Sequence, residues 1–206
     1  RLVSLEGEDR EVLAEGADFY ASPTLSDDGQ RLAWIEWDRP AQPWTRTRLM
    51  CRERNSLGGW GPTRCVAGDG DQDQSLQQPR FDGQGRLYCL CDRNGSWQPW
   101  AELDGQWQAL PAKATDHAAA PWQLGASTWI ALSPEAYLAT WFEEGFGHLG
   151  LRTEGHQVQR YASDYTRFRS LAMDETYLYA IAASPISPPA VIAIERASQQ
   201  IRVLAG

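Results

Sequence analysis

The sequence predicts an all-β chain built from repeated four-stranded antiparallel sheets. A sequence motif returns four times, short alternating strands are separated by turn-forming residues, and no window of 11 or more residues holds a helical apolar period. Repeats of about 40–50 residues with room for four strands are typical of β-propeller blades. We therefore expect a β-propeller fragment of about four complete blades plus a partial N-terminal blade.

The repeated motif is clearest in two copies, Ser22–Trp34 and Gln78–Cys89. Both contain a proline, an apolar residue, a polar turn with glycine, and an Arg-Leu pair that opens a strand. Two further copies run through residues 133–141 and 171–180. The matched leucines, separated by 55, 51 and 40 positions, are Leu32, Leu87, Leu138 and Leu178. This spacing brackets the length of one blade.

The first 15 residues predict only part of a blade. Arg1–Leu5 and Glu11–Leu13, joined by Glu6–Asp9, have the pattern of its last two strands. The chain also starts at Arg1 without a methionine, so we expect a fragment or a processed product.

The remaining residues divide into four blades of one propeller region, at 16–67, 68–115, 116–163 and 164–206. Glycine-bearing turns separate the strands, and Asp104-Gly105 is a strong hairpin signal. The expected strands are Asp18–Leu25, Arg31–Trp37, Arg48–Glu53, Thr63–Ala67, Trp97–Leu103, Trp107–Leu110, Tyr137–Phe142, His148–Arg152, Gln157–Tyr161, Tyr177–Ala182, Val191–Glu195 and Ile201–Leu204.

Composition limits the class of partner. The 206 residues are 42% hydrophobic and 22% charged, which is ordinary for a globular chain. A formal net charge of −8 argues against a nucleic acid or an anionic membrane, because both need a positive face. No apolar stretch approaches the ~20 residues of a membrane span, and no signal peptide opens the sequence. We expect a cytoplasmic location.

The four cysteines are Cys51, Cys65, Cys89 and Cys91. Cys89 and Cys91 alternate on one expected strand, so both point to the same face and are poorly placed to bond to each other. No second Cys or His pair at a finger-like spacing completes a zinc site. We interpret the cysteines as free thiols and expect no cofactor.

Several segments resemble the propeller of the prolyl oligopeptidase family of serine peptidases, in its acylaminoacyl- and dipeptidyl-peptidase-like branch. They are Asp18–Gly29 with Leu32–Trp34, the loop Trp37-Asp38 to Pro43-Trp44, Ser75–Pro79, Cys91–Trp97, and Ser184-Pro185 to Pro188-Pro189-Ala190-Val191. The similarity covers nearly the whole chain.

This resemblance implies a two-domain enzyme. An α/β-hydrolase domain of the same parent chain would carry a Ser-Asp-His triad, and the propeller would restrict its substrates to short peptides. The hydrolase domain itself is missing from the sequence, so we expect no catalytic residue and no hydrolase or aminopeptidase activity in this chain alone.

The nearest approach to a nucleophile motif is Gly125-Ala126-Ser127-Thr128-Trp129. A hydrolase elbow needs Gly-x-Ser-x-Gly at a strand-turn-helix junction, and here the fifth residue is Trp with no helix signal after it. His148 and His156 follow beside glycines in expected hairpin turns, and His117 lies in an expected inter-blade loop. We interpret all four polar residues as structural.

Two acidic groups are candidate binding sites. Asp69, Asp71 and Asp73 imitate the start of a calcium loop, but its sixth and twelfth positions hold Gln74 and Arg80 where Gly and a bidentate acid are needed. We interpret them as a solvated loop, with a cation site as the alternative.

Glu143 and Glu144 are the second candidate, because dipeptide-releasing relatives of the resembled family hold the substrate's ammonium with paired propeller carboxylates. That family places its pair in an inserted helical segment. Here Gly145 follows and strands flank the pair, so a hairpin turn is the favoured interpretation.

Two other functions stay open at this stage. One is a TolB-like propeller whose end loops bind a protein, and the other is a sugar-processing enzyme with carboxylates converging from several blades. An incomplete ring would also leave apolar blade faces exposed, which predicts either association of two copies through their terminal blades or a need for the missing blades for full stability.

Overall fold

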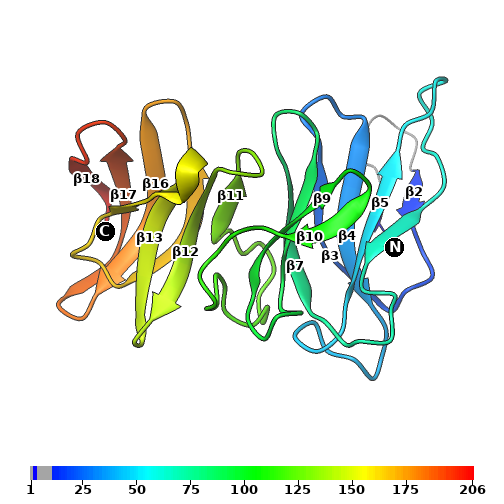
Figure 1. Cartoon of the computed structure of the whole chain (residues 1–206), viewed down its shortest axis with the longest axis horizontal. Helices are drawn as coiled ribbons and strands as arrows, with labels where there is room; N and C mark the ends of the chain where they lie inside the picture. Colours follow the sequence, from blue (N-terminus) through cyan, green and yellow to red (C-terminus); the bar gives the residue numbers. More distant parts are fainter. Residues whose placement is uncertain (1, 4–10) are drawn as a thin grey trace. The chain divides into compact units, whose positions relative to one another are not determined.

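A computed structural model describes residues 2, 3 and 11–206, and the chain divides into two compact units (Figure 1). Unit 1 comprises Arg1–Ala109 and Ala120–Leu124, and unit 2 comprises Leu110–Ala119 and Gly125–Gly206. The described residues form four four-stranded antiparallel sheets and one two-stranded sheet. The all-β propeller prediction is therefore confirmed.

Unit 1 contains the two-stranded sheet and two blades, each with its strands in sequence order. The two-stranded sheet pairs β1 (Leu2–Val3) with β2 (Val12–Ala14). The first blade consists of β3 (Phe19–Leu25), β4 (Arg31–Trp37), β5 (Arg48–Glu53) and β6 (Arg64–Ala67). The second consists of β7 (Leu76–Phe81), β8 (Leu87–Cys91), β9 (Gln98–Leu103) and β10 (Gln106–Ala109). The expected connection Glu6–Asp9 lies outside the described residues.

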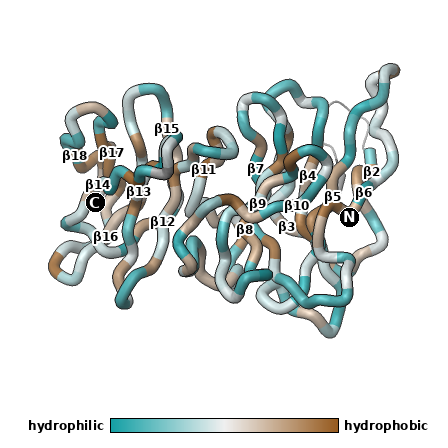
Figure 2. Tube along the Cα trace, viewed as in Figure 1, coloured by the Kyte–Doolittle hydropathy of each residue, from teal (hydrophilic) through white to brown (hydrophobic). Residues whose placement is uncertain are grey.

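Unit 2 contains the other two blades. The third blade consists of β11 (Trp129–Ala131), β12 (Tyr137–Glu143), β13 (Phe146–Arg152) and β14 (Val158–Tyr161), with a short 3-10 helix η1 (Glu154–His156) before β14. The fourth consists of β15 (Arg167–Met173), β16 (Tyr177–Ser184), β17 (Ser187–Glu195) and β18 (Ile201–Ala205). Figure 2 shows hydrophobic stretches along these sheets and hydrophilic residues in many connecting turns.

Strand β4 shows how a blade buries both of its faces. Successive side chains on a strand point to opposite faces. Ala33 and Ile35 pack into a core shared with β7 and β8, whereas Leu32 and Trp34 pack with Ala14 of β2. A blade between two neighbours therefore needs apolar residues at consecutive positions, as the buried run Leu32–Ile35 provides.

The core of unit 2 lies between the two blades of that unit, the third and fourth of the chain. Leu138 and Leu149 of the third blade pack against Leu178, Ile192 and Ile194 of the fourth, all of them nearly inaccessible to solvent. Full burial of such a side chain contributes about 1.5–3 kcal/mol to folding.

The repeated motif corresponds to a β-bulge in the first strand of a blade. Ser22, Gln78 and Ser170 all have a positive φ, of 51°, 55° and 56°. In each strand the pairing register shifts across that residue. Ser127 holds the equivalent place in the third blade, three residues before Ile130, which pairs with Leu138 as Leu25 pairs with Leu32. A bulge bends and twists its strand, so the repeat encodes the same bend in the first, second and fourth blades.

Hairpin turns follow the sequence prediction, whereas several strands are longer than expected, β17 by the most residues. Asp104-Gly105 and Glu144-Gly145 form two-residue turns with positive φ at both positions. Strand β17 begins at Ser187 rather than Val191 and includes Pro188-Pro189. These prolines lie in the register shift between β16 and β17 and before the first residue that pairs with β18, so the ladder does not need their missing N–H groups.

In the described part of the chain, no helix has the length and apolarity needed to cross a membrane.

Candidate functional site

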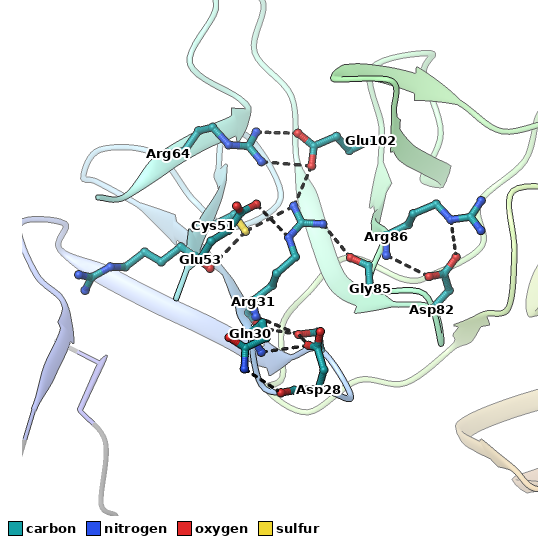
Figure 3. Close-up of polar contacts among 12 residues, drawn as sticks. Asp28, Gln30, Arg31, Cys51, Glu53, Arg64, Asp82, Gly85, Arg86 and Glu102 are labelled. Carbon is teal, nitrogen blue, oxygen red and sulfur yellow. Dashed lines mark hydrogen bonds and ion pairs between the residues drawn. The ribbon is translucent and has the colours of Figure 1, made fainter. Parts of the chain in front are cut away.

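The largest described hollow lies in unit 1, where one end of the first blade meets the second. Its volume is about 510 Å³. The turn at Asp28, the starts of β4 and β6, the end of β5 and the Gln84-Gly85 turn surround it (Figure 3). Its lining is strongly polar and includes the arginines Arg31, Arg54, Arg64 and Arg86 and the acids Asp28, Glu53 and Glu102.

Arg31 and Glu102 connect the two blades across this hollow. The Arg31 guanidinium donates to the Gly85 carbonyl at 2.7 Å and to Glu102 Oε2 at 3.0 Å, and its Nε lies 3.2 Å from Glu53 Oε1. Arg64 reaches both oxygens of Glu102, at 2.6 and 3.2 Å (Figure 3). Glu102 of the second blade is thus shared by two arginines of the first.

The electrostatics of this group favour the ionised carboxylate. Burial alone would raise the pKa of Glu102, but hydrogen bonds from Arg64 and Arg31 outweigh it and leave that pKa below its usual value. The same pairing raises the pKa of Arg64. Charge-assisted bidentate bonds of this kind are among the stronger hydrogen bonds in proteins.

The other two arginines of the hollow are also held by their own blades. Arg54 donates to the carbonyls of Gly29 and Gly58 and lies 4.4 Å above the Trp60 ring. Arg86 Nε lies 3.1 Å from Asp82 Oδ2. These pairings, within a blade and between two blades, suit blade assembly and polar contact.

The structure places Glu143 at the end of β12 and Glu144 in the following turn, where it is exposed. Glu143 Oε1 lies 2.8 Å from Lys113 Nζ, and its Oε2 lies 2.8 Å from the Arg160 guanidinium. These contacts, the hydrogen bond from Lys113 first, lower the pKa of Glu143 to about 2. Glu143 therefore has two cationic partners within its own unit, and its role as an ammonium ligand stays a prediction.

The predicted acidic loop does not bring its carboxylates together around a common point. Asp73 pairs with Arg46 at 3.2 Å, and Arg46 also donates to the Gly70 carbonyl. Asp69 and Asp71 are exposed. Among the described residues, no group of three or more His, Cys, Asp or Glu side chains is arranged to hold a metal ion.

Ser127 lies at the bulge position of its blade rather than at an elbow. Its hydroxyl donates to the Leu171 carbonyl at 2.9 Å, and its own carbonyl accepts from the Leu171 N–H at 2.7 Å. His148 belongs to β13, opposite Trp141, as the expected strand His148–Arg152 predicts; the alternative interpretation of this residue as part of a hairpin turn was wrong. His117 is buried in its loop, and its Nδ1 donates to the Thr115 carbonyl at 3.0 Å. The contacts described for Ser127 include no histidine.

Sequence reasoning missed the Arg31–Glu102–Arg64 group. A partial signal was present, because the Arg-Leu pair of the repeat places Arg31 and Arg86 at equivalent strand starts. Glu102 gives no such signal, since its partners are 71 and 38 residues away along the chain.

Comparisons with solved structures identify the architecture. A puromycin-hydrolysing peptidase of Mycobacterium tuberculosis matches with a TM-score of 0.83 and 27% identity, over 95% of this chain and 30% of that one. The chain has the β-propeller architecture of these peptidases. Prolyl oligopeptidase B of Galerina marginata matches this peptidase-type propeller with a TM-score of 0.65 and 14% identity, over 90% of this chain and 26% of that one. TolB of Acinetobacter baumannii matches with a TM-score of 0.68 and 13% identity, over 98% of this chain and 47% of that one.

The resemblance to the prolyl oligopeptidase family that the sequence indicates is thus confirmed at the level of the propeller. The chain spans about 30% of the length of the puromycin-hydrolysing peptidase that it matches. No protein-family model and no curated protein matches the sequence.

Proposed function

We propose that this chain is the non-catalytic propeller of a serine peptidase of the prolyl oligopeptidase type, and that it restricts access to an α/β-hydrolase active site of the same protein. The observation that carries the proposal is the match to a puromycin-hydrolysing peptidase at 27% identity over 95% of the chain. The mechanism is steric: rigid blades admit short peptides and keep folded polypeptides away from the nucleophile.

Two features of the structure support a rigid, non-catalytic role. The polar groups of the 510 Å³ hollow pair with one another across two blades, so they hold the blades in place. Ser127, the residue nearest to a nucleophile motif, is engaged with the backbone of β15.

The test compares substrates of different length on the protein encoded by the complete gene. We expect hydrolysis of aminoacyl and dipeptidyl chromogenic substrates and at least a tenfold slower cleavage of a long, unfolded polypeptide such as casein per susceptible bond. Equal rates on both would overturn the gating role. Absence of any hydrolase sequence beside the propeller would overturn the peptidase assignment.

A TolB-like binding propeller is the second candidate, favoured by a match that covers 98% of this chain. An export signal upstream in the gene, together with capture of a protein partner by the loops at the blade ends, would support it over the peptidase.

A further inference from the structure

The two ends of a blade carry different kinds of side chain. At one end, which we call the entry end, the chain enters the first strand and the second strand is joined to the third, through residues 38–47 in the first blade. The turns at the opposite end join the first strand to the second and the third to the fourth. In unit 1 these turns surround the polar hollow, as Figure 3 shows for the turns at Asp28 and Gly85.

Aromatic side chains are exposed at the entry ends. Among the described residues, the opposite ends expose leucines but no Phe or Trp, and these leucines are Leu25, Leu57 and Leu132. The exposed Phe and Trp side chains all lie at the entry end of a blade or in the segment that leads to β11, and they are Phe19, Trp122, Phe142 and Phe146. Exposed apolar surface that is concentrated in one place is typical of an interaction site.

Unit 1 presents these rings as two stacked pairs. Trp122 is 72% exposed, and its ring lies 4.2 Å from the ring of Trp44 in the loop 38–47, measured between centroids. The rings of Phe19 and Trp37 stack at 5.2 Å beside the start of this loop. We call these four residues the aromatic patch. Trp is among the residues that contribute most to protein–protein binding when a partner covers them.

The loop that carries Trp44 is held in place by the neighbouring blade. The Pro43 carbonyl accepts a hydrogen bond from the Ser75 hydroxyl at 2.8 Å, and the Thr47 N–H donates to the Gln74 carbonyl at 3.0 Å. A loop that is already ordered loses little entropy when a partner binds. The patch is therefore preorganised for contact.

The charged side chains of this loop are already paired. With distances between nitrogen and oxygen of 2.7, 3.4 and 3.2 Å, the three pairs are Arg48–Asp38, Arg39–Asp18 and Arg46–Asp73. The loop thus presents aromatic surface without an unpaired charge of its own. Such a surface complements a neutral, apolar protein surface better than a cation or a polyanion.

We propose that the entry end of unit 1 is the surface on which the α/β-hydrolase domain of the same protein docks, with Trp44 and Trp122 as its anchors. This inference rests on the proposed function. The match covers only 30% of the puromycin-hydrolysing peptidase, so that protein has ample chain for a second domain. Each unit by itself exposes aromatic residues at its entry ends, which favours a broad partner such as a folded domain over a short peptide.

Hydroxyl-radical footprinting tests the docking surface without any substitution, by comparing this chain with the protein encoded by the complete gene. Trp122 and Leu57 are the probes, because they are 72% and 94% exposed and Leu57 lies at the opposite end, between β5 and β6. We expect Trp122 to be oxidised about fivefold more slowly in the complete protein and Leu57 at an unchanged rate. An unprotected Trp122, or equal protection of Leu57, would overturn the proposal.

Photo-crosslinking identifies what covers the aromatic patch. In the complete protein, p-benzoylphenylalanine replaces Trp122 in one variant and Leu57 in the control. We expect the first variant to crosslink to a peptide of the hydrolase domain and the control to give no such product. A crosslink from position 122 to another blade or to a second copy of the protein would overturn the proposal.

A third experiment separates this inference from the proposed function. In the complete protein, Trp122→Ala removes an anchor, so we expect casein cleavage to rise about threefold relative to hydrolysis of a dipeptidyl chromogenic substrate, with no change in Leu57→Ala. Absence of a hydrolase sequence, or equal rates on both substrates in the unaltered protein, would defeat the proposed function. Selective hydrolysis by the unaltered protein with the same ratio in Trp122→Ala would contradict only the docking surface.

Discussion

At the scale of single residues, Glu102 stabilises the contact between two blades, because both of its arginine partners belong to the other blade. An exposed ion pair contributes little, because water screens both charges and the long side chains lose entropy. Glu102 differs because its side chain is only 14% exposed and both of its oxygens accept charged donors. Removing one partner from such a group leaves poorly solvated charge behind.

Glu102→Gln should therefore lower the free energy of unfolding by about 1–3 kcal/mol. Glu53→Gln is the matched control, since Glu53 also pairs with Arg31 but its side chain is 61% exposed, and it should cost less than about 1 kcal/mol. Urea denaturation of the two variants provides the measurement. Equal effects would mean that burial does not govern the strength of this group.

The ionisation of Glu102 predicts that the stability of the fold depends on pH. The pKa of Glu102 is lower in the folded chain than its ordinary value of 4.5, so its stabilising contribution is complete above about pH 4.5 and is lost as the pH falls through the folded value. The stability difference between the unaltered chain and Glu102→Gln should shrink below pH 4.5. A difference that stays constant down to pH 3 would contradict this.

Gly150 tests the close approach of Trp141 to the third blade. Gly150→Ala places a Cβ within 2.8 Å of the Trp141 ring, so we expect a loss of about 1–3 kcal/mol of stability from overpacking. Gly70→Ala is the control, because nothing lies within 4 Å of its Cβ position and its φ is not positive. Thermal unfolding should show almost no change for that variant.

At the scale of elements, the bulge in the first strand of the first, second and fourth blades is specified by sequence but needs an unusual backbone conformation. A non-glycine residue with φ near +55° pays about 1 kcal/mol or more in steric strain. Ser170 is exposed, so its side chain adds little packing to offset that strain. The bend therefore depends on the backbone at this residue rather than on its side chain.

Ser170→Gly should be neutral or raise stability by up to about 1 kcal/mol, whereas Ser170→Val should lower it by about 1–2 kcal/mol, because a β-branched residue fits a positive φ poorly. Calorimetry of both variants measures the difference. If valine is tolerated as well as glycine, the positive φ is not a requirement of the bulge.

Elements were more predictable than the contacts between them. The apolar run in Arg31–Trp37 and the Asp104-Gly105 turn are local signals, and the structure follows them. The start of β17 at Ser187 was not predicted; the strand includes Pro188-Pro189, because a proline is tolerated wherever the ladder does not use its N–H. Glu143 pairs with Lys113 and Arg160, which lie 30 and 17 residues away from it in the sequence. No local pattern could therefore have indicated these partners.

At the scale of the whole molecule, the polar groups of the peptidase-type propeller stabilise its blades. Its described polar groups pair within their own units: arginines with carboxylates in the hollow of unit 1, and Glu143 with Lys113 and Arg160 in unit 2. A catalytic site needs the opposite arrangement, with an activated nucleophile and a base that are held in reach of each other and of a substrate. These pairings support the proposed non-catalytic role.

The last prediction concerns the reactivity of the serine side chains in the purified protein. A fluorophosphonate probe labels a serine only when a base activates its hydroxyl. The Ser127 hydroxyl instead donates to the Leu171 carbonyl, and Ser127 lies just before β11, at the place in the repeat that corresponds to Ser22 and Ser170. We expect no labelling of the folded chain above that of a heat-denatured sample, with a known serine hydrolase as positive control, and no hydrolysis of aminoacyl chromogenic substrates. Labelling that disappears in Ser127→Ala would show that this serine is activated, and the propeller would then have to be assigned a reaction of its own.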